Sequence, residues 1–124
     1  MHISRSDSAC WIGVDLDGTL AVDHGYESIF KIGEPVPAMV ARVKVWLAKG
    51  IEVRVVTARV GPGNSLTTLS VARLVIRAWC FKHIGQQLPV TASKDFNMLE
   101  LWDDRAVRVI ANTGIRADAP LAMI

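Results

Sequence analysis

The stretch that decides the fold is Trp11–Leu20, WIGVDLDGTL. It starts as an apolar run typical of a buried strand, and the run ends abruptly in Asp15 and Asp17, followed by Gly18 and Thr19. Asp and Gly are turn residues, so a solvated turn is one interpretation. Two carboxylates that directly follow a buried strand also suit a binding site. The rest of the sequence decides between a solvated turn and a binding site.

Strand-like and helix-like patterns alternate along the chain, which indicates an α/β domain with a mainly parallel sheet and right-handed crossovers. The interval from Ser93 to Asn97 is too short for a full helix, so either a single turn bridges the third and fourth strands or one pairing there is not parallel. The expected elements, in order, are a strand at about 10–14, a helix that opens at Pro35 or Pro37 and stops at Gly50, a strand at 51–57, a helix at 66–84, and short strands in LPVTA, MLELW and AVRVIAN (88–92, 98–102 and 106–112).

Length and composition indicate one soluble domain of 124 residues. No apolar run approaches the roughly 18 to 20 residues of a membrane span, and the start lacks the layout of a signal peptide, so we expect a cytoplasmic protein without a membrane partner. A formal net charge of +2 is too small to indicate a nucleic-acid partner, and a nucleic acid stays possible only as a substrate. The high hydropathy leaves room for a homo-oligomer, and Cys10 and Cys80 are expected to be buried, reduced thiols.

Polar side chains follow four of the expected strands. Ligands of open parallel sheets gather at the carboxyl ends of the strands, so we expect four carboxylates, one hydroxyl and two cations to face one crevice. Uncompensated carboxylates would repel one another, and oxygen-only ligands fit Mg²⁺. The residues at the strand ends are Asp15 and Asp17, then Thr57 with Arg59 beyond it, then Ser93 and Lys94, and finally Asp103 and Asp104.

The same residues suit a phosphoryl group. Lys94 would supply positive charge beside Mg²⁺ and the Thr57 hydroxyl, and phosphoryl transfer depends mostly on positioning and charge neutralisation. Arg59 could bind a substrate phosphate bidentately, although an arginine after a strand is equally often a surface residue. A carboxylate can itself be the nucleophile and form an aspartyl-phosphate. The sequence therefore predicts phosphoryl chemistry at this edge of the sheet.

Four motifs resemble those of the haloacid dehalogenase (HAD) superfamily and occur in the family's order across most of the chain. DLDGTL after an apolar strand resembles the first motif, and VRVVTAR, with its Thr, resembles the second. Lys94 in TASKD stands where the third motif's lysine falls, and LWDD resembles the fourth motif. The resemblance implies a single HAD-like domain over 1–124, a Rossmann-like sandwich with helices on both faces of the sheet.

The resemblance also implies a role for each matched acid. Asp15 would attack phosphorus, and Asp17 would protonate the leaving group and then activate the hydrolytic water. An aspartate at the position of Asp17 is typical of the phosphohydrolase branch and disfavours dehalogenation. Mg²⁺ would be held by the Asp15 carboxylate, the Asp17 backbone carbonyl and Asp103, with Asp104 helping directly or through water.

Thr57 would hydrogen-bond the phosphoryl oxygens, and Lys94 would steady both the nucleophile and the phosphate. The interval at about 21–34 leaves room for the family's small flap and no cap domain, and the interval 93–103 is also too short for a cap. The chain therefore resembles the minimal, capless members, whose open sites admit large substrates or are closed by another subunit. Residues from about 113 to 124 form a tail without a clear period.

These patterns predict a Mg²⁺-dependent phosphohydrolase that acts on a phosphorylated substrate of unknown class. A phosphorylatable, receiver-like signalling domain is a second interpretation, because receivers also gather aspartates, a Thr and a Lys around Mg²⁺. Receivers, however, carry the phospho-accepting Asp at the end of a later strand. A HAD-like domain that has lost catalysis and serves in binding or assembly is the third, and its mark would be loss of an acid; none is lost here.

Overall fold

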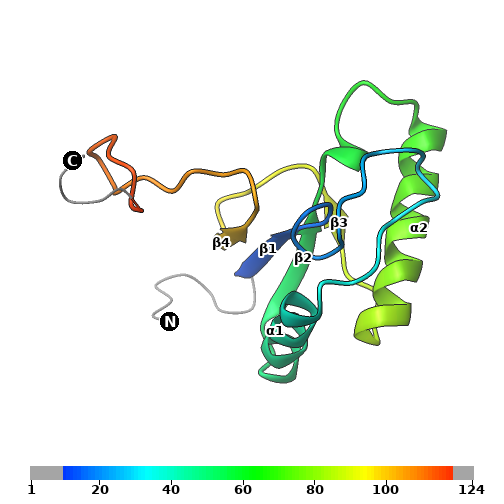
Figure 1. Ribbon diagram of the computed structural model, residues 1–124, viewed down its shortest axis with the longest axis horizontal. Coiled ribbons are helices and arrows are strands. Elements are labelled where there is room, and N and C mark those ends of the chain that lie inside the picture. The colour runs from blue at the N-terminus through cyan, green and yellow to red at the C-terminus, as the bar shows by residue number, and fades with distance from the viewer. Residues whose placement is uncertain (1–9, 119–124) are drawn as a thin grey trace.

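The structure of the protein is a computed structural model, and it describes residues 10–118. Its centre is a four-stranded sheet with strand order β3-β2-β1-β4, in which all three neighbouring pairs are parallel (Figure 1). The predicted α/β class with a parallel sheet is therefore confirmed. The strands are β1 (Trp11–Asp15), β2 (Glu52–Val56), β3 (Val90–Thr91) and β4 (Met98–Trp102).

The helices begin and end at residues with the expected local chemistry. Pro37 occupies the first turn of the first helix, where a missing N–H costs nothing. The Ser65 side chain accepts a hydrogen bond from the Thr68 N–H at 3.1 Å and caps the second long helix, and Gly85, with φ +99°, ends it. The helical elements are α1 (Pro37–Ala48), the 3-10 turn η2 (Ala58–Val60) and α2 (Leu66–Ile84).

Both helices pack on the same face of the sheet. The crossovers from β1 to β2 and from β2 to β3 proceed in one direction along the sheet, and two parallel crossovers of the same hand then leave α1 and α2 on one side. The expectation of helices on both faces is therefore not met within residues 10–118. The shared core contains Ile12, Val14, Val53 and Val55 of the strands, Met39, Val40 and Val43 of α1, and Ala72, Ile76 and Cys80 of α2.

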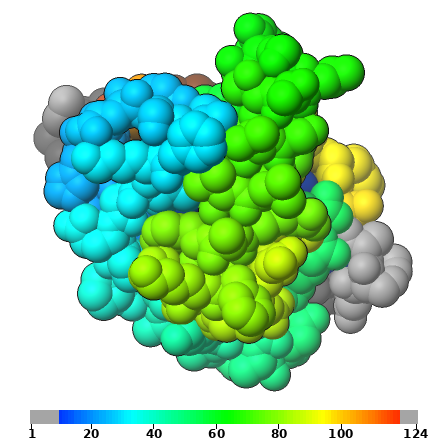
Figure 2. Space-filling model, turned by 90° about the vertical axis from the view of Figure 1, so that its right-hand side faces the viewer, coloured from blue at the N-terminus to red at the C-terminus, as the bar shows by residue number. Residues whose placement is uncertain are grey.

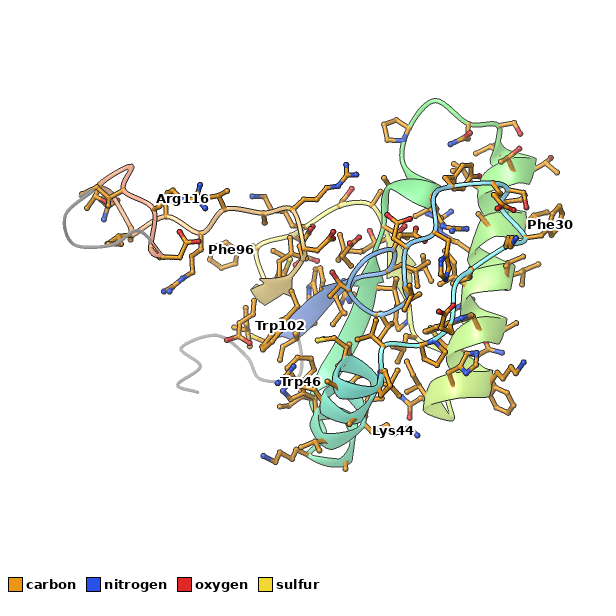
Figure 3. All side chains as sticks on the ribbon, viewed as in Figure 1. Phe30, Lys44, Trp46, Phe96, Trp102 and Arg116 are labelled. Carbon is orange, nitrogen blue, oxygen red and sulfur yellow. The ribbon has the colours of Figure 1, made fainter. Side chains whose placement is uncertain are left out.

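A pair of tryptophans joins α1 to the edge strand β4. The rings of Trp46 and Trp102 meet edge to face with centroids 5.3 Å apart (Figure 3). The guanidinium of Arg42 lies 4.8 Å from the centroid of the Trp102 ring. These contacts hold the end of β4 against α1, and so they fix where the residues after Trp102 enter the carboxyl edge of the sheet.

The short connection between β3 and β4 is a turn, and the two flanking strands run parallel. Of the two predicted alternatives, the single turn is therefore correct. Asp95 organises this turn: its Oδ1 accepts from the Asn97 N–H at 2.9 Å and from Nε1 of the fully buried Trp11 at 2.8 Å. The Arg54 guanidinium lies 4.4 Å from the centroid of the Trp11 ring. The β3–β4 connection is thus a turn held by the Asp95 carboxylate, and it contains no helix that could cover the face of the sheet opposite α1 and α2.

The segment after β4 leads away from the sheet (Figure 1). The strand predicted at 106–112 is wrong, since its pairing among the described residues is an isolated antiparallel bridge between Val109 and Arg116. β-Branched residues favour a strand only where a neighbouring strand offers a ladder to pack against. Val107, Val109 and Ile110 are accordingly exposed. The predicted tail begins in this segment, and its residues 119–124 lie outside the described part of the chain.

Residues 21–34, predicted as a flap, form a loop that contains no helix or strand. The Val22 N–H donates to the Glu34 carbonyl at 2.8 Å, which draws the two ends of the loop together. Nε1 of Trp79 in α2 donates to the Gly33 carbonyl at 3.0 Å. Figure 2 shows the loop, in blue to cyan, lying directly against α2, in green. The loop therefore rests on the helical side of the molecule, next to the carboxyl edge of β1.

The two cysteines, Cys10 and Cys80, are both buried, as predicted. Burial raises the pKa of the Cys80 thiol to about 11.

Among the helices of residues 10–118, none is long and apolar enough to cross a membrane.

Candidate functional site

Most of the residues predicted at the strand ends meet in one pocket. The pocket has a volume of about 610 Å³ and lies at the carboxyl edge of the sheet. Because β1, β2 and β4 are parallel neighbours, their last residues arrive at the same edge. The predicted residues in its lining are Asp15, Asp17, Thr57, Arg59, Asp103 and Asp104.

The turn after β1 presents the first two of these acids. The Leu20 N–H donates to the Asp15 carbonyl at 3.2 Å, and the Gly18 N–H donates to the Ala21 carbonyl at 2.8 Å. Gly18 has a φ of +91°, a left-handed conformation that glycine adopts without strain. The DLDGT sequence thereby folds back at once, with Asp15 at the strand end and Asp17 two residues along the turn.

Three carboxylates form what we call the acid cluster: Asp15, Asp103 and Asp104. One oxygen of each lies within 4.8 Å of the others, and the Thr19 hydroxyl lies 3.5 Å from Asp15 Oδ2 and 3.4 Å from Asp104 Oδ1. Burial, a hydrogen bond with Asp104 and the charges of Asp103 and Asp104 raise the pKa of Asp15 from 3.8 to about 7. Oxygen ligands so arranged could hold a hard divalent cation, whose charge would offset the repulsion.

Asp17 lies outside the acid cluster, because its carboxylate is bound to Arg59. Nε of Arg59 donates to Asp17 Oδ2 at 2.7 Å, and Nη2 donates to Asp17 Oδ1 at 2.8 Å. The Arg59 side chain is only 6% exposed. Of the two interpretations of Arg59, the surface arginine is wrong, and phosphate binding stays a prediction. In the structure the fork of the guanidinium binds the carboxylate of Asp17, the predicted general acid and base. The metal contact predicted for Asp17 involves its backbone carbonyl, which this ion pair does not occupy.

Thr57 stands at the end of β2, and it is 4% exposed. Its N–H donates to the Thr91 carbonyl at 2.9 Å, and its Oγ1 accepts from the Arg59 N–H at 3.1 Å. The side chain thus caps η2, and the hydroxyl hydrogen is left to donate toward the pocket that Thr57 lines. That arrangement suits a donor to a phosphoryl oxygen.

Lys94 is exposed and is not among the residues that line the pocket. It lies two residues beyond Ala92, which does line it. Lys94, the predicted third-motif lysine, therefore lies near the rim of the pocket, and its side chain is not part of the lining.

The lining also includes residues that were not singled out in the sequence. Arg105 follows the paired acids directly, and its N–H donates to Asp103 Oδ1 at 2.8 Å; its position after LWDD was the available signal. The loop residues had no such signal, because a loop carries no hydrophobic period. Among these further lining residues are Asp23, Tyr26 and Ile29 of loop 21–34, Asn64 before α2, and Arg105.

Comparisons with known proteins bear on the fold alone. No protein-family model matches the chain, and no curated protein matches it. Among solved structures, the chain is similar to one described as the structure of the conserved protein coded by locus from Bacteroides thetaiotaomicron. The TM-score is 0.52 at 21% sequence identity, over 77% of this chain and 76% of that chain. This likeness supports the α/β architecture described above.

Proposed function

We propose that the protein is a Mg²⁺-dependent phosphohydrolase that cleaves phosphomonoesters through an aspartyl-phosphate on Asp15. The observation that carries the proposal is the acid cluster, which shares one pocket with Asp17 and Thr57 at the carboxyl edge of a parallel sheet. The resemblance of DLDGTL and LWDD to HAD motifs points to the same chemistry. The buried cysteines agree with action in the reducing cytoplasm, which we include in the proposal.

The metal is part of the proposal because the donors fit it. Asp15, Asp103 and Asp104 offer carboxylate oxygens close together, and the Asp17 backbone carbonyl would add a fourth oxygen. With a pKa of about 7, much of Asp15 is protonated at neutral pH and is then a poor nucleophile. Bound Mg²⁺ would supply charge neutralisation, both for the ionised Asp15 and for the phosphoryl oxygens.

The reaction would proceed in two displacements. A carboxylate oxygen of Asp15 attacks phosphorus, the ester P–O bond breaks, and Asp17 gives its proton to the departing alcohol oxygen. The Asp17 carboxylate then takes a proton from water, the water oxygen attacks phosphorus, and the Asp15–phosphorus bond breaks to release inorganic phosphate. Thr57 would donate to the phosphoryl oxygens in both steps, and Lys94, reaching in from the rim, would neutralise their charge.

Hydrolysis of 4-nitrophenyl phosphate tests the proposal, with Mg²⁺ and with EDTA, for the wild type beside Asp15→Asn. We expect Mg²⁺-dependent turnover that the variant loses, because an amide of the same shape is a poor nucleophile. Equal turnover in both proteins would contradict it. If the wild type is inactive, stable labelling of Asp15 by acetyl phosphate would favour the receiver-like alternative, and no labelling would favour a domain without catalysis.

A further inference from the structure

Arg59 joins the candidate general acid to the loop that borders the pocket. Besides its two bonds to Asp17, its guanidinium donates to the Lys31 carbonyl at 2.9 Å and to the Ser28 carbonyl at 3.3 Å. The Tyr26 ring centroid lies 5.0 Å from its central carbon. One nearly buried side chain therefore binds a carboxylate in the turn after β1 and three positions in loop 21–34.

The geometry of this pair restricts what Asp17 can do. Both of its carboxylate oxygens accept hydrogen bonds from Arg59, so the planar guanidinium fixes the plane and the orientation of the carboxyl group. Each oxygen keeps a second lone pair, which is left for a leaving group or for water. Displacement of Arg59 would change the position of Asp17 and of residues 26–31 together.

We propose that Arg59 is a positioning residue that couples loop 26–31 to Asp17. It acts through Asp17 and does not itself bind the phosphoryl group. This inference rests on the proposed function, in which Asp17 is the general acid and base. A substrate that displaces the loop would displace the acid with it. Arg59 is suited to this role because its planar fork holds the carboxylate with two donors while its remaining N–H groups reach the backbone.

Leaving-group dependence separates this role from direct phosphate binding. Departure of an alkoxide needs a proton from Asp17, whereas departure of 2,4-dinitrophenolate does not. We therefore expect Arg59→Gln to lower kcat for ethyl phosphate by about a hundredfold and to leave formation of the phospho-enzyme from 2,4-dinitrophenyl phosphate nearly unchanged. A direct phosphate ligand would instead raise KM for both esters equally, and that result would overturn the proposal.

A double-mutant cycle tests whether Arg59 works through Asp17. In an Asp17→Asn background, Arg59→Gln should have little further effect on ethyl phosphate hydrolysis, because the group it positions is already gone. Multiplicative losses in the double variant would overturn the coupling. Arg77→Gln is the matched control, since Arg77 is exposed on α2 and does not line the pocket.

The loop can be probed without turnover. A lysine-specific protease should cleave after Lys31 faster in Arg59→Gln than in the wild type or Arg77→Gln, because the Lys31 carbonyl has lost its guanidinium donor. Cleavage after the exposed Lys94 is the internal reference and should not change. An inactive wild type would refute the proposed function, whereas unchanged cleavage after Lys31 would refute the role of Arg59, so the two failures are distinguishable.

Discussion

The backbone at Gly18 lies against the carboxylate of Asp104: a Cβ atom at Gly18 would be 2.6 Å from Asp104 Oδ2. Gly18→Ala therefore has to displace the Asp104 carboxylate as well as strain a backbone with φ +91°. We expect the left-handed conformation to cost about 1–2 kcal/mol and the steric contact about 1 kcal/mol more. Urea unfolding measures the free-energy loss, and calorimetric titration with Mg²⁺ should show weaker binding.

Gly25→Ala separates the two contributions. Gly25 has a similar φ of +89°, and a Cβ there would meet nothing within 4 Å. The backbone strain is thus shared by the two variants, whereas the displacement of Asp104 belongs to Gly18→Ala. Equal losses of stability and of Mg²⁺ affinity in both would show that the approach of Gly18 to Asp104 has no consequence.

The raised pKa of Asp15 predicts how the stability of the metal-free protein changes with pH. Between about pH 4 and about pH 7 the folded protein keeps a proton on Asp15 that the unfolded chain has lost. Stability from this group is therefore full at low pH and declines as the pH rises toward 7. In EDTA, the melting temperature of Asp15→Asn minus that of the wild type should increase over this range and level off above it.

Addition of Mg²⁺ should reverse that trend. A cation bound by the acid cluster favours ionised Asp15, so the wild type should gain melting temperature at pH 8 more than Asp15→Asn does. A difference between the two proteins that is independent of pH in EDTA would show that the Asp15 carboxyl titrates as an ordinary exposed group.

The rim position of Lys94 gives a third prediction. If its ammonium reaches the phosphoryl group when substrate binds, Lys94→Gln should lower kcat/KM for 4-nitrophenyl phosphate by about a hundredfold, as loss of one charge-stabilising donor does. Lys82→Gln removes the same charge from an exposed position on α2 and should retain wild-type activity. Similar kinetics for the two variants would exclude Lys94 from the site.

The fold was predictable where local chemistry and tertiary packing agree. α2 runs over Leu66–Ile84 as expected, because Ser65 caps one end and Gly85 ends the other. The strand predicted at 106–112 is wrong because, within residues 10–118, its β-branched residues have no adjacent strand with which to form a ladder. The placement of both helices on one face depends on strand order, which the periodicity of a single segment does not contain.

The candidate site was predictable in part for a similar reason. Parallel strands bring their ends to one edge, so Asp15, Thr57 and Asp103 could be expected together. The ion pair between Asp17 and Arg59 could not, because it joins side chains 42 positions apart and also depends on backbone carbonyls of an irregular loop. Sequence alone left open whether Arg59 would bind phosphate or be a surface residue, and it did not indicate the pairing with Asp17.

The Asp95 carboxylate holds the turn between β3 and β4 against Trp11 of β1, and the fourth prediction concerns its removal. Asp95→Ala deletes acceptors for the Asn97 N–H and for Nε1 of Trp11, which is fully buried. Because an unpaired buried donor costs about 1–3 kcal/mol, we expect a loss of about 2 kcal/mol in the free energy of unfolding. Asp23→Ala is the matched control, since Asp23 accepts from the Gly25 N–H in an exposed turn of the same kind. Urea unfolding that gives equal losses for both variants would mean that Asp95 serves only its own turn and does not hold the β3–β4 connection against β1.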